Sequence, residues 1–169
     1  MPQKVLVAYA TKKGSTQQVA GAIADELRGR GFDVTTLAAS AVRSVEPYDG
    51  VVLGGSLYMG RWHADARRLL ERHTDELATR LLAVFAIGPL TSGLDDLASA
   101  RRQLDHALDK IAEVQPVTVA VFGGVVDPTH LPFPFSHMAA SDARDWDQIR
   151  NWARTVAAMF AAMRTRTAS

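Results

Sequence analysis

Short apolar runs alternate with amphipathic stretches along this chain, and this alternation is the feature that most restricts its fold. Five short runs have the character of strands inside a sheet: residues 5–9, 33–38, 51–55, 81–87 and 117–122. Between them, apolar residues recur at helical spacing in four stretches: 16–28, 64–78, a third that begins near Asp95, and 146–163. Strands joined through helices form a parallel sheet covered on both faces. The pattern predicts a doubly wound α/β fold, with residues 1–169 as a single domain.

The composition narrows the class of protein. The chain has 169 residues, is 47% hydrophobic and carries a net charge of +1. That length suits one domain with a substantial core, and the near-zero charge argues against nucleic acid as a partner. No apolar run approaches the roughly 20 residues of a membrane-spanning helix, and no signal peptide is recognisable. We expect a cytoplasmic protein with at most peripheral membrane contact.

Several kinds of catalytic site are excluded by missing residues or spacings. The chain has no cysteine, hence neither a thiolate nucleophile nor a sulfur-ligated metal. Its five histidines show no metal-binding spacing, and we expect no metal. No G-x-S-x-G or Ser-His-Asp pattern is readable. Any redox chemistry would therefore belong to a bound cofactor.

In a doubly wound sheet, ligands bind in the loops that follow the strands. The first such loop contains three hydroxyl residues and one glycine at the start of a helix: Thr11, Lys12, Lys13, Gly14, Ser15 and Thr16. Backbone N–H groups and the helix dipole favour a phosphate there. The alternative is an ordinary helix cap by Ser15 or Thr16. The glycine patterns of dinucleotide and P-loop nucleotide sites are missing, as are the acidic residues of a receiver domain.

The segment Thr11-x-x-Gly14-x-Thr16 after a first strand resembles the phosphate loop of the flavodoxins, with Lys13 where they usually have a further hydroxyl residue. The run from Tyr48 to Ser56 is similar to their third strand and its exit. The resemblance extends over essentially the whole chain. It implies a five-stranded parallel sheet of order 2-1-3-4-5 with helices on both faces.

A narrower resemblance is to the bacterial menaquinone-dependent protoporphyrinogen oxidase family. It rests on residues 55–63, Gly-Ser-Leu-Tyr-Met-Gly-Arg-Trp-His, and on residues 145–149, Asp-Trp-Asp-Gln-Ile. The stretch 126–144 departs from that family because it is shorter and has a single arginine. It is either a lid over the substrate or a passive loop whose Phe133 and Phe135 pack on the sheet edge.

The resemblance implies FMN as a non-covalent cofactor, with a deazaflavin as the alternative. Residues 11–16 would hold the phosphate, with Lys12 and Lys13 adding positive charge; the alternative for the two lysines is a solvated pair. The loop after the third strand would lie along the flavin ring, with Tyr58 and Trp62 as stacking candidates: Ser56, Leu57, Tyr58, Met59, Gly60 and Trp62. The two later loops would contact the ring edge and the substrate face: Pro89, Leu90, Thr91, Ser92, Gly93, Gly123 and Gly124.

Each of these residues also has a structural interpretation. Trp62 or Tyr58 could pack on the second helix, and Thr91 or Ser92 could cap the third. His63 is a candidate for a proton relay and otherwise a surface or capping residue. Arg61 is a catalytic candidate whose charge would favour reduced flavin, and otherwise an exposed side chain at a helix start.

The function implied is an FMN-dependent oxidoreductase similar to the protoporphyrinogen oxidases. It would move electrons between an organic substrate, such as a porphyrin, and an acceptor such as a quinone. One alternative is a non-catalytic electron-transfer flavodoxin with a redox partner protein. The net charge of +1 counts against it, because such shuttles are strongly acidic. The other alternative keeps the fold without a flavin.

Overall fold

The computed structural model describes residues 2–11, 14–58, 60–88, 94–111, 113–126, 141–142 and 144–168. The first half of the chain contains β1 (Lys4–Ala10), α1 (Ser15–Gly29), β2 (Asp33–Ala38), the 3₁₀ turn η1 (Ala39–Ala41), β3 (Gly50–Tyr58), β4 (Arg61–Trp62), α2 (Ala64–Arg72) and α3 (Thr74–Leu77). The second half contains β5 (Leu81–Ile87), α4 (Leu94–Asp109), β6 (Thr118–Phe122), β7 (Val125–Val126), β8 (Ser141–Asp142) and α5 (Trp146–Ala168).

Five parallel strands form the sheet in the order β2-β1-β3-β5-β6. Counted by the five long strands alone, this is the predicted order 2-1-3-4-5, and the predicted fold class is confirmed. Two short pairings were not predicted: β4 turns back antiparallel on the end of β3, and β7 pairs antiparallel with β8. Both lie beyond the carboxyl ends of long strands.

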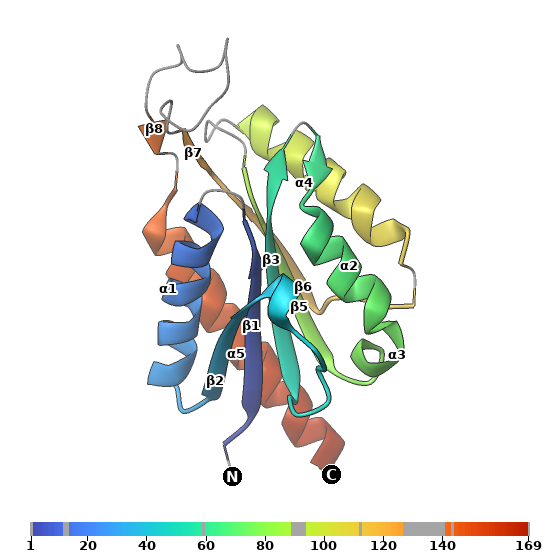
Figure 1. The fold of residues 1–169 in the computed structure, drawn as a ribbon. Coiled ribbons are helices and arrows are strands. Elements are labelled where there is room, and N and C mark those ends of the chain that lie inside the picture. The colour runs from blue at the N-terminus through green and yellow to red at the C-terminus, as the bar shows by residue number, and fades with distance from the viewer. Residues whose placement is uncertain are drawn as a thin grey trace.

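The sheet is covered on both faces, with α1 and α5 on one side and α2 and α4 on the other (Figure 1). Successive side chains of β1 point to opposite faces of the sheet. Val5 and Val7 pack in the core beneath α1 and α5, and Leu6 and Ala8 pack in the core on the other face. All four side chains are fully buried. A strand buried on two faces must be apolar at every position, which explains why this run shows no polar alternation.

The second helix differs from the prediction of one helix over 64–78. It divides at His73, whose backbone (φ −117°, ψ 24°) leaves the helical region between α2 and α3. The Thr74 hydroxyl donates to the carbonyl oxygens of Leu70 and Glu71. Leu70 and Leu77 are nevertheless both buried. A break of one residue leaves the helical pattern of apolar positions intact, so the pattern alone does not reveal the break.

Candidate functional site

The carboxyl ends of the central strands meet at one edge of the sheet, the upper edge in Figure 1. Ala10 at the end of β1 pairs with Gly55, Ser56 with Ile87, and Ile87 with Phe122. The loops that follow these strands are therefore neighbours. Gly88 and Phe122 are joined directly, because the Gly88 N–H donates to the Phe122 carbonyl at 2.9 Å.

The loop after β1 leads into α1, whose N-terminus has no side-chain cap. Gly14 is the N-cap residue of α1, in the left-handed conformation (φ 87°), and no side chain caps the helix there. The Gly14 N–H donates to Thr11 Oγ1 at 3.0 Å. The first turn of α1 contains no acidic residue, so its positive dipole end has no compensating side chain of its own. The structure thus does not show the alternative cap by Ser15 or Thr16.

Thr16 has an unusual environment for a hydroxyl residue. It is fully buried, and its Oγ1 has no hydrogen-bond partner. A buried hydroxyl without a partner costs about 1–3 kcal/mol, and such groups in native proteins call for a specific explanation. Here the hydroxyl stands in the first turn of a helix whose N-terminus lacks a side-chain cap. Lys12 and Lys13 lie outside the described residues.

The loop after β3 is a tight hairpin formed with β4. Tyr58 pairs with Arg61 and Leu57 with Trp62, and Gly60 at the turn has φ 77°, which favours glycine. Tyr58 is 47% exposed and Arg61 is also exposed. The hairpin therefore presents one aromatic ring and one cation at the edge of the sheet, while Met59 lies outside the described residues.

Trp62 is turned away from this surface. Its indole is 1% exposed, belongs to the core under α2, and donates its Nε1–H to the Gly55 carbonyl at 3.1 Å. Glycine at 55 is required by this packing, because a Cβ there would lie 2.7 Å from Nε1. A ring that stacks on a surface ligand must be accessible in the free protein. In this structure Trp62 has the alternative role, packing in the core beneath the second helix.

His63 caps α2, as its structural interpretation has it. Its Nδ1 accepts a hydrogen bond from the Asp65 backbone N–H at 3.1 Å, and the backbone N–H of His63 donates to the Ser56 carbonyl at 2.9 Å. The imidazole is 15% exposed. These bonds tie the hairpin to the start of the helix. Arg61 lies on β4, before the helix begins.

The remaining loops are described only in part. Pro89, Leu90, Thr91, Ser92 and Gly93 fall outside the described residues. Gly88, just before them, packs closely against the hairpin, since a Cβ at 88 would lie 3.3 Å from Leu57 Cβ. Gly123 and Gly124 are buried after β6. Within the described ranges, no group of three acidic or histidine side chains is placed to hold a metal ion.

Arg144 is a residue near this site that sequence reasoning missed. Its guanidinium hydrogen-bonds both carboxylate oxygens of Asp142 and the side-chain oxygen of Gln18 in α1, and lies 4.8 Å from the Trp146 ring centroid. The hydrogen bonds from Arg144 hold the pKa of the Asp142 carboxyl below its ordinary value. No local pattern could reveal a contact with a residue 126 positions earlier. It fastens the chain before α5 to the first turns of α1.

Known proteins are similar to this chain in sequence and in fold. A relative, protoporphyrinogen IX dehydrogenase [quinone] of Escherichia coli K12, is 22% identical over 91% of this chain and 94% of its own. Flavodoxin of Streptococcus pneumoniae TIGR4 superposes with a TM-score of 0.59 at 16% identity, covering 95% of this chain and 99% of that one. Flavodoxin 2 of Bacillus cereus gives 0.59 at 21%, covering 92% and 99%. These structural likenesses establish the fold alone.

Among the helices that the described residues form, none is both long and apolar enough to cross a membrane.

The model of the Flavodoxin domain family matches residues 6–138, which is well over half of the sequence. The chain therefore belongs to the flavodoxin domain family, and it is a flavodoxin-type flavin oxidoreductase or electron carrier.

Proposed function

We propose that this protein binds FMN at the carboxyl edge of its sheet and moves electrons between an organic substrate and an acceptor such as a quinone. The observation that carries the cofactor is the environment of Thr16. Its Oγ1 is buried and unpartnered in the first turn of a helix that has glycine, and no side-chain cap, at its start. A phosphate oxygen at this helix end would accept from that hydroxyl and from backbone N–H groups of the first helical turn, which have no partner inside the helix.

The residues present fit such a group. Thr11 already turns its Oγ1 toward the Gly14 N–H, and the absence of a Cβ at Gly14 leaves the backbone open. We assign the phosphate to Thr11, Gly14, Ser15 and Thr16, with Lys12 and Lys13 supplying charge. The ring would lie against Tyr58, whose exposed face suits stacking, with Ser56, Leu57, Met59 and Gly60 beside it and the loops 89–93 and 123–124 at its edges.

When bound, FMN would supply the electron chemistry. The protein's own part is to hold and orient the cofactor and to set its potential. Arg61 is exposed on the same hairpin as Tyr58, and a cation near the ring favours the reduced state. We therefore expect a higher reduction potential than that of strongly acidic flavodoxins.

The choice of a porphyrinogen substrate and a quinone acceptor rests on the Escherichia coli relative, whose name states both. At 22% identity this supports the class of reaction, and the hairpin sequence 55–63 supports it further. The second candidate, a carrier that only passes electrons between proteins, would need a docking surface for a redox partner.

Identifying the bound chromophore tests the cofactor assignment. We expect the purified protein to be yellow and to release FMN on denaturation; a colourless protein that ignores added FMN would refute it, and a deazaflavin would differ in absorbance. Gly14→Val should lower FMN affinity, and unchanged affinity would contradict the loop assignment. Anaerobic mixing with protoporphyrinogen IX as electron donor and a quinone as acceptor then separates an oxidase from an electron carrier, which would neither oxidise the porphyrinogen nor reduce the quinone.

A further inference from the structure

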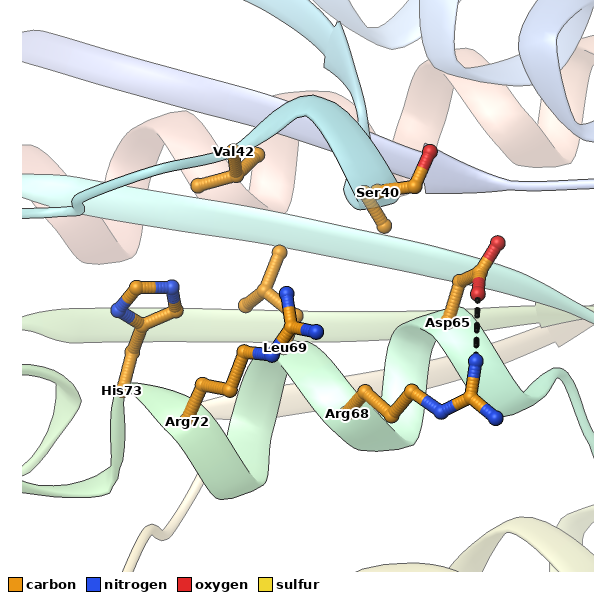
Figure 2. Close-up of a pocket in the computed structure, with 8 residues that line it drawn as sticks. Ser40, Val42, Asp65, Arg68, Leu69, Arg72 and His73 are labelled. Atoms are coloured by element: carbon orange, nitrogen blue, oxygen red, sulfur yellow. Dashed lines mark hydrogen bonds and ion pairs between the residues drawn. The ribbon is translucent and has the colours of Figure 1, made fainter.

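A concave site separate from the candidate cofactor loops lies on the α2 face, between η1 and the exposed side of the helix. It is a pocket of about 120 Å³. Figure 2 shows it with the turn after β2 above and α2 below. The lining comes from two segments only: Ala39, Ser40 and Val42 from the turn, and Asp65, Arg68, Leu69, Arg72 and His73 from the helix and its end. The loops assigned to the cofactor contribute none of these residues.

The floor of the pocket is apolar. Ala39, Val42 and Leu69 are 3–5% exposed and belong to the core cluster on this face. Burying apolar surface of a ligand on such a floor is favourable in proportion to the area removed from water. A purely hydrated ion would gain nothing from this part of the site.

The rim is basic. Arg68 and Arg72 stand one helical turn apart and both line the pocket. In Figure 2 the Arg72 guanidinium points toward the turn and the Arg68 guanidinium points toward Asp65. Arg68 pairs with Asp65 at 3.5 Å, and both side chains are partly exposed; such a pair is weak and yields readily to another anion. Arg72 has no ion-pair partner in the part of the chain that the structure describes.

The two remaining polar residues of the lining, Ser40 and His73, add no further charge to the pocket. The Ser40 side chain is exposed at the opposite wall. His73 is buried, and its Nδ1 lies 3.4 Å from Glu76 Oε2, which also accepts from the Val45 N–H. Glu76 is thus engaged outside the pocket. Two arginines against Asp65 leave a surplus of one positive charge, which matches a monoanion.

We propose that this pocket binds a small organic monoanion, a carboxylate carried on a short apolar group. Arg72 would hold the carboxylate, with Arg68 exchanging part of its contact with Asp65 for the ligand, and the Ser40 hydroxyl would donate to it. The apolar part would rest on Val42 and Leu69. A dry cavity of roughly 150 Å³ accommodates benzene, so this smaller pocket suits a chain of butyrate size.

The test is a residue-resolved titration of the full chain by ¹H–¹⁵N NMR with three probes. Butyrate carries both the charge and the apolar group, butyramide only the apolar group and an amide, and inorganic phosphate only the charge. We expect butyrate to shift the amides of Ser40, Val42, Arg72 and His73 more strongly than either control probe. Shifts confined to Gly14–Gln17 would instead report the phosphate loop, so the two sites are distinguished.

A matched pair of variants tests the assignment to Arg72. Arg72→Gln should weaken butyrate binding about tenfold, the effect of one lost charged hydrogen bond. Arg102→Gln, an exposed arginine on α4, should leave it unchanged, and an unaltered melting temperature in both verifies folding. Equal binding of butyrate and butyramide, or equal affinity of Arg72→Gln and the parent, would overturn the proposal.

Discussion

The aromatic ring of Phe85 occupies the place where Gly54, its register partner on the adjacent strand, would carry a side chain. Both residues are buried, Gly54 on β3 and Phe85 on β5. Phe85 also packs on Trp152 of α5, with ring centroids 5.8 Å apart. The glycine at 54 is therefore part of the core, where the absence of a Cβ makes room for an aromatic ring.

Gly54→Ala should destabilise the protein, because a Cβ would overlap the Phe85 ring. Overpacking of this kind costs about 1–3 kcal/mol or more, measurable as the free energy of unfolding in urea. Phe85→Leu makes space, so the double variant should be more stable than the sum of the two single changes predicts. Strict additivity would contradict the packing described.

Gly14→Ala and Gly21→Ala should change stability in opposite directions. Neither added Cβ meets a neighbouring atom within 4 Å, but Gly14 has φ 87° whereas Gly21 is helical. Alanine in the left-handed region costs roughly 1–2 kcal/mol, while alanine inside a helix gains about 0.5–1 kcal/mol. Urea unfolding of the two flavin-free variants checks both signs. A stabilised Gly14→Ala would show that the loop does not need this conformation.

Thr16→Val should separate stability from cofactor binding. Valine removes the buried, unpartnered hydroxyl, so the flavin-free protein should gain up to about 1–3 kcal/mol of unfolding free energy. FMN affinity should fall about tenfold, the effect of one hydrogen bond to a charged group. Fluorescence titration measures the affinity. A variant that is less stable yet binds FMN unchanged would argue that the hydroxyl is structural.

Tyr58→Ala should mainly lower FMN affinity, whereas Trp62→Phe should mainly lower folding stability. The exposed Tyr58 should contribute about 0.5–1.5 kcal/mol to FMN binding through ring contact and little to folding. Trp62→Phe removes the N–H that the indole donates to the Gly55 carbonyl, which costs about 1–3 kcal/mol of stability and should change FMN affinity less. Paired titration and unfolding experiments distinguish these patterns, and a reversal of the two effects would contradict the assignment.

Asp142→Asn should lower stability near neutral pH and have little effect in acid. Arg144 depresses the pKa of the folded carboxyl, so the stabilisation is present above the ordinary Asp value of about 3.9 and is lost as pH falls through the lower folded value. Because Asp142 is 46% exposed, the difference should be only about 0.2–1 kcal/mol. Unfolding curves between about pH 2 and pH 6 test this range. A difference that persists at the acid end would contradict the ionic origin.

The long elements could be predicted because each has a pattern of its own. The run 81–87 coincides with β5, since a doubly buried strand must be apolar throughout. The two-residue strand β4 has no period to detect, and the break at His73 preserves the apolar face on both sides.

At the site, the sequence located the loops but not the direction of every side chain. Tyr58 and Trp62 are both aromatic and four residues apart in one loop, yet one is exposed and the other is in the core. The antiparallel return of β4 decides this, and it depends on pairing with β3. The Arg144–Gln18 contact depends on the fold as a whole in the same way.

The hairpin that carries Tyr58 grows out of a strand that is hydrogen-bonded on both sides, to β1 through Gly55 and to β5 through Ser56. Its return strand is fixed in turn by the buried indole of Trp62. The hairpin is thus short and anchored at its base by strand pairing on both sides. The backbone conformational entropy of placing Tyr58 is lost when the protein folds, so a flat ligand that meets its ring need not lose that part again on binding.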